Sequence, residues 1–170
     1  MWKGGMRPSG RSAWRVAGPF SAGEVEVDSL AVRLPESAKE LIRTGALGHL
    51  VTLRPTGTPQ VTCVWAAVEG DELVTAHLNP RQQKLENVRR DPRVAVSFEG
   101  TKIHPPGLRE YMVVHGRATI EEGGAAELLQ ELAHVYLGPE VRFPPMDDPP
   151  PGVRLRILVE RVSGIGPWAE

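Results

Sequence analysis

Short connections between consecutive strand-like segments most constrain the fold of this 170-residue chain. Between residues 47 and 78, three runs rich in β-branched and other apolar residues follow one another with only turn-type residues between them. These turns are Pro55-Thr56-Gly57-Thr58 and Glu69-Gly70-Asp71. A parallel pair of strands needs a crossover of about a dozen residues or more, so the short turns predict antiparallel neighbours.

The same reading of the whole chain predicts a mainly β protein with peripheral helices. Six strands are expected, at residues 47–54, 59–68, 72–78, 94–98, 109–120 and 153–165. Helices are expected at 35–44, with Leu41 and Ile42 inward, and at 123–137. A third, short basic helix is expected to begin at Asn79-Pro80. Six prolines exclude regular structure from Gly138–Gly152 and predict an extended loop. This order favours an antiparallel barrel over a doubly wound sheet.

Composition and charge exclude several classes of protein. A net charge of −1 argues against a nucleic-acid partner, which requires a broad basic face. The single cysteine, Cys63, excludes an internal disulfide and favours the cytoplasm. No apolar run is long enough to span a bilayer, and the N-terminal residues lack the apolar core of a signal peptide. Residues 1–24 are expected to form a flexible extension before a single domain at 25–170.

The basic segment that follows the third strand is the strongest local sign of a ligand site. Between Arg81 and Arg93 the chain has five Lys/Arg and two Asp/Glu, a local charge of about +3. Cations and the free N–H groups of a helix start together favour a phosphate-bearing ligand. The alternative is an ordinary solvated helix face.

The usual catalytic and nucleotide-binding motifs are not found. There is no G-x-G-x-x-G after a strand, no Walker A sequence and no nucleophile elbow. The five histidines show no metal-ligand spacing, so no metal site is expected. A chain of this kind can still be an enzyme if a cofactor supplies the reactivity.

Three motifs in the right order carry a resemblance to a known family. They are Lys84, Asn87 and Arg89–Arg93 leading into a Val/Ala strand, then Thr58–Trp65, and the closing segment Glu160–Trp168. Together they resemble the pyridoxamine 5'-phosphate oxidase-like split β-barrel family, and within it the branch of flavin and deazaflavin oxidoreductases that use coenzyme F-420. The resemblance implies a six-stranded antiparallel split β-barrel of the FMN-binding type. It also implies a homodimer with the cofactor at the interface.

The resemblance also implies which residues contact the cofactor. The predicted contacts are Gln60, Thr62, His77, Leu78, Gln82, Gln83, Lys84 and Asn87. Lys84 is expected at the phosphate, where many relatives carry an arginine near the position of Gln82. His77 is a candidate proton donor, and no other catalytic side chain is expected. Trp65 and Trp168 are large enough to cover the ring, with core packing and a dimer contact as their alternatives.

The expected function is hydride transfer between coenzyme F-420, or alternatively FMN, and a small organic substrate. The alternative is a non-catalytic protein of the same fold that binds or stores a flavin, a deazaflavin or haem. Pyridoxamine phosphate oxidase activity itself is not expected, because the chain lacks that enzyme's C-terminal arginine segment. Arg90 and Arg93 are expected as surface or dimer-rim charges.

Overall fold

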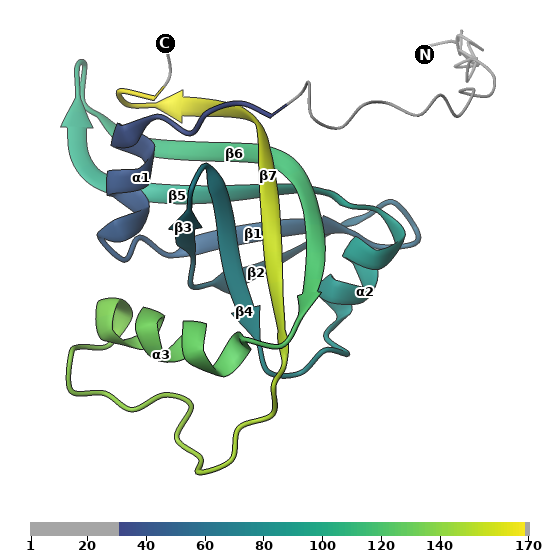
Figure 1. Cartoon of the computed structure of the whole chain (residues 1–170). Helices are drawn as coiled ribbons and strands as arrows, with labels where there is room; N and C mark the ends of the chain where they lie inside the picture. The colour runs from purple at the N-terminus through teal and green to yellow at the C-terminus, as the bar shows by residue number, and fades with distance from the viewer. Residues whose placement is uncertain (1–30, 169–170) are drawn as a thin grey trace, which may run out of the picture.

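The computed structural model describes residues 31–168, and these form one curved antiparallel sheet with three helices around it (Figure 1). The extension expected at residues 1–24 lies outside the described residues. The helices are α1 (Glu36–Arg43), α2 (Gln83–Arg90) and α3 (Ala125–Tyr136). The strands are β1 (Gly48–Leu53), β2 (Pro59–Val64), β3 (Ala67–Glu69), β4 (Glu72–His77), β5 (Arg93–His104), β6 (Leu108–Glu122) and β7 (Val153–Ile165).

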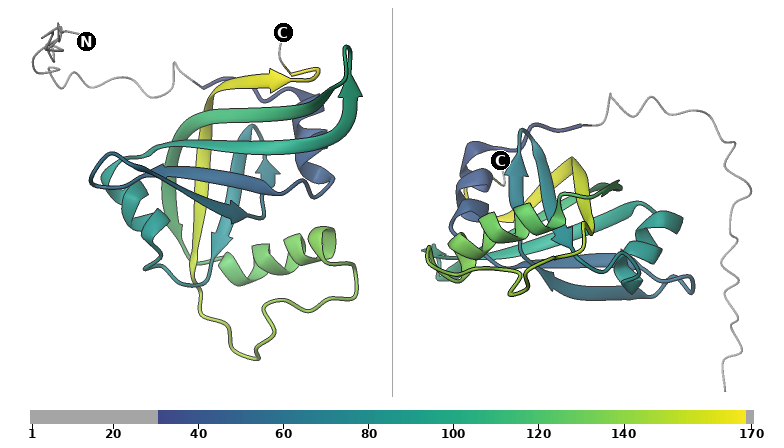
Figure 2. Two further views of the ribbon diagram at one scale, coloured as in Figure 1. Left: turned by 180° about the vertical axis from the view of Figure 1, so that it is seen from behind. Right: turned by 60° about the horizontal axis from the view of Figure 1, so that its bottom comes forward.

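The sheet has the strand order β2-β1-β5-β6-β7-β4-β3, and every described pairing is antiparallel. Figures 1 and 2 show the sheet curling, so that β4 and β7 cross steeply over β1 and β5. Among residues 31–168 no pairing joins the two edge strands, β2 and β3. The curled sheet therefore stays open, with α3 packed against β4 and α2 packed against β1 and β6.

The expected number of strands, six, is wrong by one. Residues 59–68 form two strands, because β2 pairs with β1 whereas β3 pairs with β4 on the far edge of the sheet. The chain changes partner at Trp65 and Ala66, and the Ala66 N–H donates to Tyr136 Oη at 3.1 Å. A change of pairing partner leaves no trace in a run of apolar residues, so the sequence pattern could not reveal it.

Most of the remaining elements follow the predicted pattern, but β5 continues six residues beyond its expected end at Phe98, to His104. Leu41 and Ile42 of α1 are buried, as are Val94, Val96 and Phe98 on the inner face of β5. These inward residues meet the alternating buried residues of β6 and β7 in one main core. Gly138–Gly152 contains neither helix nor strand, as its prolines predicted.

The start of α2 differs from the expectation. Asn79 does not cap the helix, and Pro80 does not occupy its first turn. Instead, Asn79 Oδ1 accepts a hydrogen bond from the Arg81 N–H at 2.9 Å, which closes a turn, and the helix begins at Gln83. Gln82 is the N-cap residue and its side chain makes no capping hydrogen bond. The first helical turn therefore lies directly beside the end of β4.

Candidate functional site

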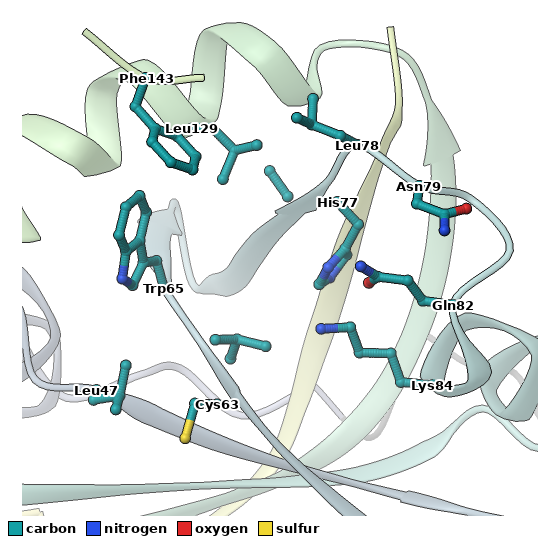
Figure 3. A pocket seen from close by; sticks show the side chains of 12 residues that line it. Leu47, Cys63, Trp65, His77, Leu78, Asn79, Gln82, Lys84, Leu129 and Phe143 are labelled. Atoms are coloured by element: carbon teal, nitrogen blue, oxygen red, sulfur yellow. The ribbon is translucent and has the colours of Figure 1, made fainter. Parts of the chain in front are cut away.

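A cavity of about 390 Å³ opens where β2, β4, the start of α2, α3 and the Gly138–Gly152 loop meet (Figure 3). This volume falls within the range of about 300–1,000 Å³ typical of small-molecule sites. The lining residues are Leu47, Cys63, Val64, Trp65, Ala76, His77, Leu78, Asn79, Gln82, Lys84, Leu129 and Phe143. Figure 3 shows that polar and apolar side chains are segregated: His77, Gln82 and Lys84 form a polar end, and Leu47, Trp65, Leu129 and Phe143 form an aromatic wall.

Gly152 brings the returning loop against the end of β4. Its φ is +58°, and a Cβ there would lie 2.5 Å from the backbone oxygen of His77. A side chain would therefore be strained by the backbone and would collide with β4. The glycine lets the proline-rich loop pass directly under His77 and Leu78, where the cavity lies.

Lys84 is a buried cation at the polar end. Only 9% of the residue is exposed, and among residues 31–168 its ammonium has no hydrogen bond or ion pair. Burial lowers the pKa of Lys84, and the nearby Cys63 thiol opposes that shift. A buried charge without a counter-charge is unfavourable, so this end of the cavity is suited to an anionic group.

His77 is neutral at physiological pH. The residue is 5% exposed, and its Nε2 shares a hydrogen bond of 2.8 Å with the Thr75 hydroxyl. Burial lowers the pKa of His77 from 6.5 to about 3, the charge of Lys84 lowers it too, and Gln82 opposes the shift. With a pKa of about 3, the imidazolium form of His77 is scarcely populated near pH 7, so the ring has no acidic proton to donate. Burial and the Lys84 charge therefore do not favour His77 as an acid, and its role as a proton donor stays a prediction.

Two further polar atoms near the cavity are buried without a partner among the described residues. They are Gln82 Oε1 and Thr62 Oγ1. Gln82 lines the cavity, whereas Thr62 lies behind it on β2. Buried polar atoms are nearly always hydrogen-bonded in native proteins, so Gln82 adds a second polar group suited to a ligand.

Three of the predicted cofactor contacts belong to a hydrogen-bond network outside the cavity. Asn87 is 1% exposed, and its Nδ2 donates to Thr52 Oγ1 and to Gln60 Oε1, each at 2.9 Å. Asn87 Oδ1 accepts from Gln83 Nε2 at 3.0 Å. This network joins α2 to β1 and β2, so Gln60, Gln83 and Asn87 hold the helix in place. Direct contact of these three with a cofactor stays a prediction.

The other predicted residues also form two groups, those that line the cavity and those that lie elsewhere. Leu78 and Trp65 line the cavity, but Trp168 does not: it is buried elsewhere and its indole donates to the Tyr111 carbonyl at 3.0 Å. The expectation that Trp168 covers a ring therefore finds no support in its position. Arg90 bonds the Leu53 carbonyl, and Arg93 pairs with Asp91 at 2.7 Å, both away from the cavity.

Sequence reasoning missed the residues that complete the cavity from distant segments. Leu129 lies on α3 and Phe143 on the proline-rich loop. No local pattern marks either residue, because their position depends on how α3 packs across β4. Leu47, Cys63 and Asn79 were also missed as lining residues. Cys63 lies between Thr62 and Val64 in β2, so alternation placed it on the face opposite to the one predicted to approach the ring and gave no signal for it.

Two features are absent from residues 31–168, a metal-binding cluster and a membrane-spanning helix. No group of three or more His, Cys, Asp or Glu side chains is arranged to hold a metal ion. No helix in this part of the chain is long and apolar enough to cross a membrane.

The curled, open antiparallel sheet with three peripheral helices defines a class of small, mainly β proteins. Within that class, the chain belongs to the pyridoxamine 5'-phosphate oxidase family, whose model matches residues 34–166. The match confirms the family resemblance drawn from the sequence motifs. The family binds flavins and includes flavin-dependent oxidoreductases.

Solved structures agree with this assignment. A protein described as an F420 reductase is 30% identical with a TM-score of 0.60, and the match covers 76% of this chain and 98% of that chain. A conserved hypothetical protein from Mycobacterium tuberculosis is 24% identical with a TM-score of 0.60, covering 80% and 86% of the two chains. HupZ from Group A Streptococcus is 18% identical with a TM-score of 0.55, covering 81% and 98%. The last two show the fold alone. Comparison with curated proteins finds no match.

Proposed function

We propose that this protein is an oxidoreductase that binds coenzyme F-420, or alternatively FMN, in the bipolar cavity and passes hydride to a small organic substrate. The observation that carries the proposal is Lys84, a buried cation that has no counter-charge among residues 31–168 and lies at one end of a largely apolar cavity. The 30% identity to a protein described as an F420 reductase favours the deazaflavin over FMN.

The polar end fits a phosphate. The Lys84 ammonium supplies a positive charge, and the Gln82 side chain, with its unpaired Oε1, supplies an amide. Both residues lie at the start of α2, where the first N–H groups of a helix have no intrahelical partner. Cation, amide and helix N-terminus together favour an anionic phosphate group. Coenzyme F-420 and FMN each carry a phosphate.

The rest of the cavity fits a planar ring. Trp65 and Val64 offer apolar surface, and the edge of β4 offers backbone groups near His77 and Leu78. The bound cofactor supplies the hydride-transfer chemistry in this proposal. The side chains of the protein orient the ring, exclude water and hold the phosphate. Because His77 stays neutral, its proposed role is to bond or orient, and a proton needed by the product comes from water.

We further propose that two copies of the chain form the complete site. Val61 on edge strand β2 is 60% exposed, and Leu47 at the mouth of the cavity is 41% exposed. Exposed apolar side chains beside an open cavity favour a protein contact that covers them. A second copy would cover this edge and close the cavity in the same step.

The proposed function is tested by identifying what the purified protein binds. We expect mass spectrometry of the released ligand to find F-420 or FMN, and fluorescence titration to show saturable binding of one of them to the ligand-free protein. Turnover with reduced cofactor and a panel of organic acceptors supports the enzyme. Tight binding without turnover of any acceptor would favour the storage alternative. No binding of either cofactor contradicts the proposal.

A further inference from the structure

The aromatic wall is an organised structure. Trp65 contacts two other aromatic rings: it stacks on Tyr136 of α3 with ring centroids 5.2 Å apart and an interplanar angle of 13°. The Phe143 ring is tilted by 57° relative to Trp65, with its centroid 5.1 Å away. Tyr136 is itself held by its hydroxyl, which donates to the Ala46 carbonyl at 3.0 Å. The position of Trp65 is therefore well defined, and Phe143 reaches the cavity from the loop.

A single side chain of α3 holds the loop that carries Phe143. Gln130 Nε2 donates to the Val141 carbonyl, and Gln130 Oε1 accepts from the Phe143 N–H, each at 2.9 Å. Its two polar atoms thus bond the backbone on either side of Arg142. Other backbone hydrogen bonds of the loop lie at its ends or within it, such as Val141 N–H to Gly138 O and Met146 N–H to Pro144 O, whereas Gln130 ties the segment around Phe143 to α3. Gln130 therefore fixes the backbone from which the Phe143 side chain projects. Figure 3 shows that side chain at the cavity, beside Trp65.

We propose that Phe143, positioned by Gln130, is a specificity-determining residue that selects a planar, uncharged, apolar substrate for this cavity. The inference rests on the proposed function, because it names the class of acceptor that would lie beside the cofactor. Leu129 and Leu47 complete the surface against which the acceptor packs.

The chemistry of the wall supports this class of substrate. Leu47, Trp65, Leu129 and Phe143 carry no formal charge, so nothing on this side compensates the desolvation of an ionic acceptor. Aromatic side chains prefer to contact other rings in offset or tilted arrangements. A flat, conjugated molecule presents such a face, whereas a saturated ring of the same carbon skeleton is thicker and lacks π electrons.

The test measures binding of an unreactive probe to the full-length protein, without turnover. The probe is 2-naphthol, which is neutral at pH 7, and its binding is followed by fluorescence anisotropy. trans-2-Decalol, which has the same carbon skeleton but is saturated, serves as the competitor. We expect 2-naphthol to bind, and decalol to displace it only at about tenfold higher concentration or more.

Variants of the loop show which residue is responsible. Phe143→Ala is expected to weaken 2-naphthol binding by about tenfold, whereas Phe143→Trp retains most of it. Met146→Ala is the matched control, because Met146 is an exposed apolar residue of the same loop that does not line the cavity. Unchanged binding by Phe143→Ala, or equal binding of naphthol and decalol, would overturn the inference.

The positioning role of Gln130 is separated from a general structural role by a double-mutant cycle. Gln130→Met keeps the length of the side chain but removes both hydrogen bonds to the loop. We expect it to weaken 2-naphthol binding in the wild-type background and to have no effect in the Phe143→Ala background. An equal loss in both backgrounds would show that Gln130 does not act through Phe143.

Cofactor titrations distinguish failure of this inference from failure of the proposed function. Lys84→Ala is expected to lose FMN or F-420 affinity and to keep 2-naphthol binding, because Lys84 lies at the opposite end of the cavity. If the protein binds 2-naphthol in a Phe143-dependent way but binds neither cofactor, the proposed function is contradicted. The inference that Phe143 selects a planar ligand is then still supported. A protein that binds a cofactor but not 2-naphthol would overturn only the inference about the wall.

Discussion

At the residue scale, two basic side chains lie at the polar end of the cavity, and one is charged whereas the other is neutral. Lys84 and His77 are both buried, and the charge on Lys84 lowers the pKa of His77. Both cannot be charged at low cost in such a site, because like charges and burial act in the same direction. The protein therefore presents one cation and one neutral polar ring to a ligand.

Replacing Lys84 tests the anion site directly. Lys84→Ala is expected to weaken binding of FMN or F-420 by about 1.5–3 kcal/mol, the usual range for a hydrogen bond to a charged group. Fluorescence titration measures the change. Arg89→Ala is the control, because Arg89 is a cation of the same helix that pairs with Glu86 at the surface. Equal affinities for the wild type and Lys84→Ala would remove Lys84 from the binding site.

The low pKa of His77 predicts how stability depends on pH. Between its unfolded pKa of 6.5 and its folded pKa of about 3, the unfolded chain binds more protons than the folded protein. Stability should therefore fall as the pH drops below about 6.5, by up to about 1.4 kcal/mol per pH unit from this residue. Urea unfolding at pH 7 and pH 5 should show a smaller loss for His77→Gln. Because His115 is shifted in the same direction and is present in both proteins, the difference isolates His77. Parallel pH dependences would contradict the assignment.

The same charge state predicts a modest role in turnover. His77→Ala should lower turnover by about 10²-fold or less, since that is the low end for general acid–base catalysis. The rate should also show no inflection due to His77 between pH 6 and pH 8. A much larger loss, with the cofactor still bound and the fold intact, would mean that His77 transfers an obligatory proton.

At the scale of elements, the position of α2 depends on one buried amide. Asn87 bonds Thr52 on β1, Gln60 on β2 and Gln83 within the helix. These contacts hold the helix against the sheet, and Lys84 is on the same two turns. The position of Lys84 in the cavity therefore depends on a hydrogen-bond network whose residues do not line the cavity.

Removing that amide should destabilise the fold. Asn87→Ala leaves buried polar groups of Thr52 and Gln60 without their donor, so the free energy of unfolding should fall by about 1–3 kcal/mol. Urea denaturation with a constant slope measures the loss. Glu86→Ala, an exposed neighbour on the same helix, should change stability by less than about 1 kcal/mol. Similar values for the two variants would show that the network contributes little.

At the scale of the whole molecule, the open edge of the sheet raises the question of assembly. Edge strands expose unpaired backbone groups, and β2 adds the exposed side chain of Val61. Covering this edge with a second copy would remove both features from solvent and enclose the cavity.

Analytical ultracentrifugation tests the proposed homodimer. The wild-type protein is expected to sediment as a dimer at micromolar concentration, and Val61→Glu to shift it toward monomer, because a charge in an apolar interface is strongly unfavourable. Thr58→Glu, at the exposed turn before β2, is the control and should remain dimeric. A wild-type protein that is monomeric throughout the micromolar range would refute the dimer.

Much of this fold could be predicted from local pattern. Alternating apolar residues located the first half of β5, and a segment dense in β-branched residues located β7. The prolines of Gly138–Gly152 excluded regular structure, as the structure confirms. The split of residues 59–68 into β2 and β3 could not be predicted, because a change of pairing partner depends on distant strands. The predicted start of α2 was wrong because Asn79 closes a turn with the Arg81 N–H. An asparagine side chain can either cap a helix or close a turn, and the local sequence does not distinguish the two.

By itself, the sequence determined the antiparallel class, the family and the basic segment that contains Lys84, because all three depend on spacing along the chain. Only the tertiary structure decided that Lys84 is buried with no partner in the described part of the chain, that His77 is neutral and that Asn87 bonds β1 and β2. It also brought Leu129 and Phe143 to the cavity from segments more than fifty residues along the chain from His77. Burial and charge coupling are properties of neighbours in space, and residues distant in sequence become neighbours only when the sheet curls and α3 packs across β4.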